Sequence, residues 1–312
     1  MNTLILHHYP ASPFAEKIRL IFGIKKLAWK SVIIPMVMPK PDVISLTGGY
    51  RRTPLLQIGA DIYCDTALIA RVLEERAPEP PVFRKAQAAS AQALAQWGDT
   101  TLFNTVVPVL YQPGSAETLF SQFKPDELKR FMEDRAAMRK NARVQRPPLS
   151  EAKPALSLFL SQLDAQLGAG RGYLLGDAPC IADLAVYHPL WFFRKGPAVA
   201  GMLAPYRHLN AWLARIDAIG HGSPSEISSA QAIDIARAAK AAPLASPGVV
   251  DAEGFKPGDR VEVAPTDYAF DPVAGELLAC TLDEIALRRT DPRAGEVAVH
   301  FPRLGYDIRR LN

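Results

Sequence analysis

The stretch Thr53-Pro54-Leu55-Leu56-Gln57, followed by Asp65-Thr66 eleven residues after the proline, decides the fold of this chain. A strand that starts at a proline has no N–H to give its first ladder partner, so that edge is left for another partner. A turn at Gly59-Ala60-Asp61 then leads to Asp65-Thr66, which opens the helical run 67–73. An acid and a hydroxyl at a helix start place a carboxylate, a hydroxyl and free backbone N–H groups at one point. The stretch therefore predicts a site for a ligand that carries both an ammonium and a carboxylate.

Alternating strand and helix patterns surround this stretch. The expected elements are strands over 4–8, 29–34, 54–57 and 61–63 and helices over 13–24 and 66–75. Ser12 is the expected N-cap of the first helix, with Pro13 at its first position. The order β-α-β, then β-β-α, predicts a thioredoxin-like domain over residues 1–78, closed by the stiff Pro-rich linker 78–81.

Two further units are expected after this linker. Residues 84–241 carry helical periodicity almost throughout, which predicts an all-α domain with helices over 86–107, 126–144, 150–167, 181–193, 206–219 and 226–241. The composition changes to Pro, Ala, Ser and Gly around 242–248. Residues 249–312 are then β-prone and turn-punctuated, which predicts a small all-β domain, an SH3-like barrel with five strands near 260–263, 276–281, 284–289, 296–301 and 306–309.

The composition excludes several classes of protein. A formal charge of +4, from 36 basic and 32 acidic residues without a basic block, argues against a nucleic-acid partner. No run reaches the roughly 18 apolar residues of a membrane span, and the first residues lack a basic signal-peptide region. Cys64, Cys180 and Cys280 lack C-x-x-C spacing, and the histidines are scattered, so neither a disulfide framework nor a metal site is expected. A cytoplasmic protein is the expectation.

Four segments of the chain resemble the cytosolic glutathione S-transferases. They are Ser12-Pro13-Phe14, Thr53-Pro54, Asp65-Thr66 and the stretch Gly176-Asp177-Ala178-Pro179-Cys180-Ile181-Ala182-Asp183. Their order and spacing agree with the family from residue 4 to about 240, and no standard member needs the unit 249–312. The resemblance implies a cis Thr53–Pro54 peptide, a two-fold homodimer and glutathione as co-substrate, with no metal.

The resemblance assigns glutathione binding to Phe14, Arg52, Thr53, Pro54, Asp65 and Thr66. Thr53 would pair its backbone with the cysteinyl part of the ligand, as an added strand does. Asp65 would accept the γ-glutamyl ammonium, and Thr66 would hold the γ-glutamyl carboxylate at the helix N-terminus. Arg52 would meet the glycyl carboxylate, with Lys40 as an alternative.

Ser12 is the expected catalytic residue, because its position matches the hydroxyl of the serine-type transferases. A hydroxyl that donates to sulfur favours the thiolate, which is the nucleophile. Two alternatives stay open, a plain N-cap role for Ser12 and a catalytic role for Tyr9. The redox branch of the superfamily has a cysteine at position 12, and this chain does not.

The sequence favours an enzyme that activates glutathione for attack on a hydrophobic electrophilic small molecule. The acceptor pocket is expected between the two larger domains, with Trp97, Phe103, Val107 and Tyr111 as candidate walls. The alternative is a non-catalytic glutathione-binding or scaffold protein whose β-barrel is an interaction module. A glutathione-dependent dehalogenase or isomerase would share the same site.

Overall fold

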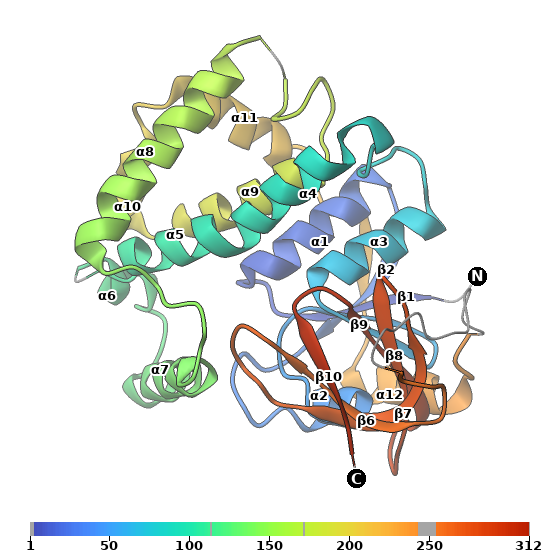
Figure 1. Cartoon of the computed structure of the whole chain (residues 1–312). Coiled ribbons are helices and arrows are strands. Elements are labelled where there is room, and N and C mark those ends of the chain that lie inside the picture. Colours follow the sequence, from blue (N-terminus) through green and yellow to red (C-terminus); the bar gives the residue numbers. More distant parts are fainter. Residues whose placement is uncertain (1–2, 113, 171, 243–253, 312) are drawn as a thin grey trace.

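The computed structural model describes residues 3–112, 114–170, 172–242 and 254–311 (Figure 1). Apart from Ala242, the expected linker 242–248 lies outside the described residues, as do residues 249–253 of the expected third unit. Among the described residues, no helix is both long and apolar enough to cross a membrane.

The first unit is thioredoxin-like, as the sequence predicted. Its elements are β1 (Leu4–His8), α1 (Pro13–Ile24), β2 (Ala28–Ile33), α2 (Pro41–Thr47), β3 (Leu55–Ile58), β4 (Asp61–Cys64) and α3 (Thr66–Arg76). β1 pairs in parallel with β2 and antiparallel with β3, and β3 and β4 form a hairpin. Ser12 caps α1 through its Oγ, which accepts from the backbone N–H of Ala15 at 3.2 Å. The Thr53–Pro54 peptide is cis, as expected. The short helix α2 was not predicted.

The second unit is helical and packs on α1, chiefly through its helix α9. Its helices are η1 (Lys85–Gln87), α4 (Ala88–Trp97), α5 (Phe103–Leu110), α6 (Ser115–Leu119), α7 (Pro125–Arg139), α8 (Leu149–Gly168), α9 (Ile181–Phe193), α10 (Pro197–Ala200), η3 (Gly201–Leu203) and α11 (Arg207–Asp217). A π-helical turn, η2 (Gly98–Leu102), joins α4 to α5. α9 is buried along almost its whole length, because it runs between α1 and the other helices. Figure 1 shows α7 apart from α8 and α9, on the side that faces the strand-rich part.

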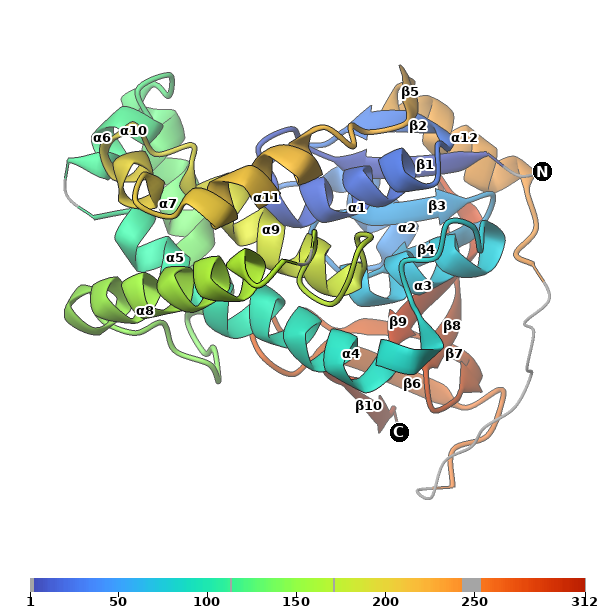
Figure 2. The same ribbon diagram turned by 90° about the horizontal axis from the view of Figure 1, so that it is seen from above.

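The chain then returns to the first unit, which differs from the expected helical domain over 84–241. β5 (Ser223–Glu226) pairs in parallel with β2 at the edge of the sheet. α12 (Ser229–Ala238) packs against the same sheet, beside β1 and β2 (Figure 2). Its buried side chains, among them Ala232 and Ile233, join the apolar core of Ile5 and Val32. The helical periodicity predicted α12 correctly, but it did not reveal that this helix packs on the sheet and not in the helical unit.

The last described part of the chain is all-β, as predicted. Its strands are β6 (Arg260–Pro265), β7 (Val273–Cys280), β8 (Glu284–Asp291), β9 (Gly295–Pro302) and β10 (Tyr306–Arg310). We call these strands and their loops the C-terminal unit. They do not stand apart as a separate barrel: β9 pairs in parallel with β4, giving one ten-stranded sheet in the order β10-β6-β7-β8-β9-β4-β3-β1-β2-β5. One apolar core therefore spans the first unit and the C-terminal unit.

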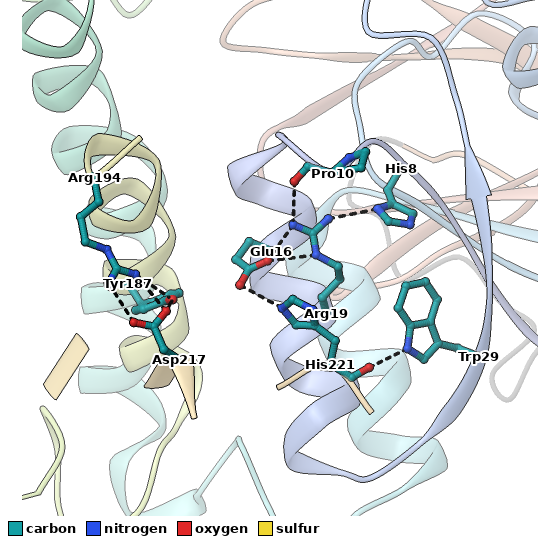
Figure 3. A network of polar contacts seen from close by, with 9 residues as sticks. All are labelled: His8, Pro10, Glu16, Arg19, Trp29, Tyr187, Arg194, Asp217 and His221. Carbon is teal, nitrogen blue, oxygen red and sulfur yellow. Dashed lines mark hydrogen bonds and ion pairs between the residues drawn. The ribbon is translucent and has the colours of Figure 1, made fainter. Parts of the chain in front are cut away.

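A buried polar network fixes the loop between β1 and α1, which carries Ser12. Figure 3 shows Arg19 of α1 donating to Glu16, at 2.7 Å and 3.0 Å, and to the carbonyl of Pro10 at 3.0 Å. Arg19 also lies 3.0 Å from Nδ1 of His8, and Glu16 lies 3.0 Å from Nε2 of His221. Because these groups come from β1, α1 and the segment after α11, the network ties the helical unit to the start of α1.

Candidate functional site

A cavity of about 830 Å³ opens between the three units of the chain. The first unit contributes Tyr9, Ser12, Phe14, Lys40, Arg52 and Thr53 to its wall. The helical unit contributes many rings and several cations, among them Phe103, Tyr111, Phe120, Phe131, Arg135 and Arg139. The loop before β7 adds Asp267 and Tyr268. The C-terminal unit is thus part of the site, which the sequence did not reveal.

Ser12 lies at the wall of this cavity and at the N-terminus of α1. Its Oγ accepts the Ala15 N–H, so the expected N-cap role is confirmed. The Ser12 hydroxyl lies close enough to the phenol of Tyr9 to act against the effect of burial on the Tyr9 pKa. Burial raises the pKa of Tyr9, which keeps its phenol protonated at neutral pH. Both candidate donors therefore meet at one point of the wall.

Thr53 and Lys40 lie next to each other on the same wall. The Lys40 Nζ donates to the Thr53 hydroxyl and to the Arg51 carbonyl, each at 3.3 Å. Burial, with the nearby guanidinium of Arg135, lowers the pKa of Lys40 to about 8. Lys40 still carries its positive charge at neutral pH, and an anionic ligand group beside it would raise this pKa and be stabilised by the charge.

Asp65 and Thr66 are placed at the start of α3, as predicted, but Asp65 already has partners. Its carboxylate accepts the Ala67 N–H at 2.9 Å and the phenol O–H of Tyr306 at 3.1 Å. Burial, together with the Asp65 carboxylate, raises the pKa of Tyr306, so the phenol stays a donor. Within the described residues, neither Asp65 nor Thr66 lies on the cavity wall. The expected ammonium site is occupied by a side chain of the C-terminal unit.

Arg52 is also held by the C-terminal unit. Its guanidinium forms an ion pair with Asp267 and donates to the backbone carbonyl of Tyr268. It also lies over the Tyr268 ring, 3.9 Å from the centroid. Arg52 lines the cavity but is already neutralised, so Lys40 is the freer cation for a ligand carboxylate.

A buried ionic cluster that sequence reasoning missed lies behind the Ser12 wall. Lys17 of α1 donates to Asp99 of η2 at 2.6 Å, and His188 of α9 lies 2.9 Å from the same carboxylate. Burial opposes the charge on Asp99, but Lys17 and His188 outweigh it and lower the pKa of Asp99. Lys17 also reaches the Thr66 hydroxyl at 3.4 Å. The cluster joins the two domains, and a lysine on the buried face of α1 was its only sequence signal.

The expected pocket residues are mostly where the helical spacing put them. Phe103, Val107 and Tyr111 line the cavity. Trp97 instead packs edge-on against Phe159 in the helical core, with ring centroids 5.2 Å apart. Among the described residues there is no cluster of three or more side chains suited to hold a metal ion.

Comparison with known proteins identifies the family. Residues 6–81 match the glutathione S-transferase N-terminal domain, and residues 122–219 match the C-terminal domain. The crystal structure of a GST-like protein from Pseudomonas syringae is 43% identical and covers 100% of both chains, with a TM-score of 0.84. This chain belongs to the glutathione S-transferase superfamily. Because that transferase-like relative matches over the full length, the likeness includes the C-terminal unit.

Two further proteins that resemble this chain differ in what their names describe. FtsZ-localized protein A from Caulobacter vibrioides is 28% identical over 185 residues, which are 58% of this chain and 72% of that protein. A glutathione S-transferase from Rhodospirillum rubrum is 20% identical, covers 69% of this chain and 88% of its own, and has a TM-score of 0.52. The second likeness shows the fold alone.

Proposed function

We propose that the protein is a glutathione transferase whose thiol site and acceptor pocket are the two ends of the interdomain cavity. The observation that carries the proposal is that Ser12, Tyr9 and Thr53 line one cavity whose other walls combine many aromatic rings with several charged side chains. A cavity with apolar and aromatic walls and a limited set of polar groups is typical of a small-molecule site. Glutathione would lie along Thr53 with its sulfur near Ser12 and its glycyl carboxylate near Lys40 or Arg52.

In the proposed reaction, Ser12 donates its hydroxyl hydrogen to the sulfur, since its oxygen already accepts the Ala15 N–H. This hydrogen bond and the N-terminus of α1 both favour the thiolate over the thiol. The thiol proton passes to solvent. The thiolate then forms a sulfur–carbon bond with an electrophilic acceptor, and a leaving group departs with its electron pair or a double bond takes up a proton.

Conjugation of glutathione to 1-chloro-2,4-dinitrobenzene tests the proposal. We expect Ser12→Ala to lower kcat by about tenfold or more, because one pKa unit of lost thiolate stabilisation corresponds to a factor of ten. Calorimetry should show unchanged glutathione binding to this variant. Tyr9→Phe is the matched control, since it removes the neighbouring hydroxyl. Loss of activity in Tyr9→Phe alone would transfer the catalytic role to Tyr9.

A non-catalytic binding or scaffold protein is the second candidate. It is favoured by the contacts of Tyr306 with Asp65 and of Asp267 with Arg52, which satisfy two of the residues expected to bind glutathione. The likeness to FtsZ-localized protein A is a further reason to keep it. Retention on immobilised glutathione without any turnover would support this candidate.

Location and assembly belong to the same proposal. We place the protein in the cytoplasm, a reducing compartment, where its cysteines, which are buried and form no disulfide with one another, would stay reduced. We also propose the two-fold homodimer of the family. The edge of β4 is paired with β9 and is therefore not open to a strand of the second chain. Light scattering that gives twice the chain mass of 34.1 kDa would support it.

A further inference from the structure

α7 differs from the other long helices in how it is attached. None of its residues is buried, whereas α8 buries a row of leucines. Leu128, Phe131, Arg135 and Met138, spaced three to four residues apart, form its half-buried side. In proteins, packing of an apolar side supplies most of the stability of a helix. Apolar packing therefore holds α7 in place only weakly.

Polar contacts with the first unit hold the middle of α7. Asp134 forms an ion pair with Arg51 and accepts the N–H of Met38 at 3.1 Å. Arg135 donates to the carbonyl of Met36. The Arg51 and Asp134 side chains are only 12% and 8% exposed, so water and salt screen their attraction little. We call these contacts of Asp134 and Arg135 with the first unit the latch.

The C-terminal end of α7 is bonded to the C-terminal unit instead. The carbonyl of Met138 accepts the N–H of Ala269 at 2.8 Å, and the N–H of Arg143 donates to the carbonyl of Asp267 at 2.8 Å. The Arg139 guanidinium also lies over the Tyr268 ring, 5.6 Å from its centroid. These main-chain bonds involve none of the groups of the latch, so this end stays attached if the latch opens.

The first half of α7 has the fewest attachments. Among the described residues, the side chains of residues 126–130 form hydrogen bonds only within α7 and its start. A second cavity, of about 290 Å³, lies between this half and the loop after β2. The ring of Phe131 contacts Phe120 and Phe123, which belong to the preceding segment of the same unit. Nothing in this half duplicates the latch.

α7 is also a wall of the interdomain cavity. Phe131, Met132 and Ala136 line it together with Ser12 and Thr53 of the first unit. Figure 1 shows α7 apart from α8 and α9, so it can move without disturbing the core of the helical unit. Segments with few buried apolar contacts open at low free energy, and enzymes use such segments as covers for their sites.

We propose that α7 is a lid on the interdomain cavity, fixed at its C-terminal end to the C-terminal unit and closed by the latch to the first unit. Opening breaks the contacts of Asp134 and Arg135 and leaves the main-chain bonds of Met138 and Arg143 intact. The role of this lid as a gate for the acceptor rests on the proposed function. Its movement needs no thiol and no reaction.

Hydrogen exchange of the full chain, followed by mass spectrometry, tests the movement. We expect amide protection factors in α7 to be at least about tenfold lower than those in α8, because α7 leaves its place without global unfolding. Asp134→Asn removes the charge of the latch and should lower the protection of α7 a further threefold or so, with α8 and α9 unchanged. Equal protection of α7 and α8 in the wild type would overturn the proposal.

Two further variants locate the effect at the latch. Glu133→Gln is the matched control, because Glu133 is the neighbouring carboxylate, is exposed and has no ion pair among the described residues. It should leave the exchange of α7 unchanged. Arg51→Gln breaks the latch from the first unit and should act like Asp134→Asn, which rules out a change of helix propensity as the cause. A loss of protection in Asp134→Asn that Glu133→Gln reproduces, or that extends to α8 and α9, would contradict the lid.

The failure of the lid and the failure of the transferase are distinguishable. Low protection of α7 that depends on Asp134, without any glutathione conjugation, leaves the lid standing and removes the transferase. Conjugation by a protein whose α7 is as protected as α8 supports the transferase and overturns the lid. If both proposals hold, Asp134→Asn should change kcat and KM for the aryl halide together, as changes in a gating segment do.

Discussion

Asp65 is the residue whose surroundings say most about specificity. Its backbone has the left-handed φ of 72°, and its side chain caps α3. In this chain the carboxylate also holds Tyr306, whose phenol is in turn 3.1 Å from that of Tyr50. A ligand ammonium can reach Asp65 only in competition with a hydrogen bond that is already made.

The affinity for the γ-glutamyl head should therefore be weak. N-acetylcysteinylglycine keeps the thiol, the amide and the glycyl carboxylate of glutathione but lacks this head. By calorimetry we expect the two thiols to bind the wild type within about threefold of each other, since a charge-assisted hydrogen bond of roughly 1.5–3 kcal/mol is not gained in full. Tyr306→Phe should tighten glutathione several-fold and leave the truncated thiol unchanged.

Tyr50→Phe is the control for this experiment, because it removes a phenol next to Tyr306 that does not bond to Asp65. Glutathione binding tenfold tighter than the truncated thiol in the wild type would contradict the expectation. The sequence placed Asp65 and Thr66 correctly at the start of α3. Nothing in the sequence indicated the contact with Tyr306, because 241 residues separate it from Asp65.

At the scale of single elements, α9 has the best-defined start. The Asp183 carboxylate, which is fully buried, accepts the N–H groups of Leu174 and Cys180 at 2.9 Å and 3.0 Å, and that of the Trp212 indole at 3.0 Å. The Cys180 thiol lies 3.3 Å from the same carboxylate. The Asp183 side chain thus connects α9 to α11 and to the loop between α8 and α9.

Removal of the Asp183 carboxylate should strongly destabilise the folded protein. We expect Asp183→Ala to lower the free energy of unfolding by about 3 kcal/mol or more, because three buried donors lose their acceptor. Cys180→Ser should change it by no more than about 1 kcal/mol, since serine is a good N-cap and keeps a donor toward Asp183. Urea unfolding of both variants measures the difference. A large loss in Cys180→Ser would mean that packing of the thiol, not capping, matters at this position.

Elements with strong patterns were predictable, and elements defined by their neighbours were not. α9 was predicted at its observed bounds, because its cap signal and apolar run are both clear. α2 was missed because a seven-residue segment with Val, Ile and Thr has no helical signature of its own. β5 has the exposed sequence Ser-Pro-Ser-Glu, which lacks the apolar alternation that predicts a strand. It is a strand because it pairs with β2.

For the whole molecule, the buried histidines of β1 set the response to acid. His7 bonds to Gln57 at 2.8 Å, and His8 to Ser31 at 2.9 Å. Burial lowers the pKa of His7 to about 4 and that of His8 to about 3, from 6.5. As the pH falls, these two histidines are therefore protonated in the unfolded chain at a higher pH than in the folded chain. The stability that these groups contribute is complete above pH 6.5 and is lost toward pH 4 and 3.

Between pH 7.5 and pH 5 we expect the free energy of unfolding to fall by about 2 kcal/mol for each of the two histidines. Denaturant titrations at both pH values measure this fall. His7→Gln, which keeps a donor for Gln57, should remove about half of it. His300 acts in the opposite direction: Asp61 and Glu284 outweigh its burial and raise its pKa, so its contribution is lost only as the pH rises. A free energy of unfolding that is the same at both pH values would contradict this account.

The arrangement of the three units was only partly predictable. The thioredoxin-like and helical patterns and the strand-rich end were all present in the sequence. The join between β9 and β4 was not, because parallel pairing of Asp61–Tyr63 with residues 298–300 leaves no local mark on either segment. For the same reason the sequence could not place Asp267 beside Arg52 at the site.

The pairing of β4 with β9 has a consequence for how the protein is made. The ribosome produces β4 well before its partner β9, so the nascent first unit exposes one edge of its sheet while the whole helical unit is being made. Unpaired strand edges recruit other chains, which makes this interval a period of exposure to misassembly. A truncated mRNA that ends before the codon for Gly295 would yield a protein without β9, whose β4 edge stays unpaired. Chaperones or proteases would have to bind or degrade such a product.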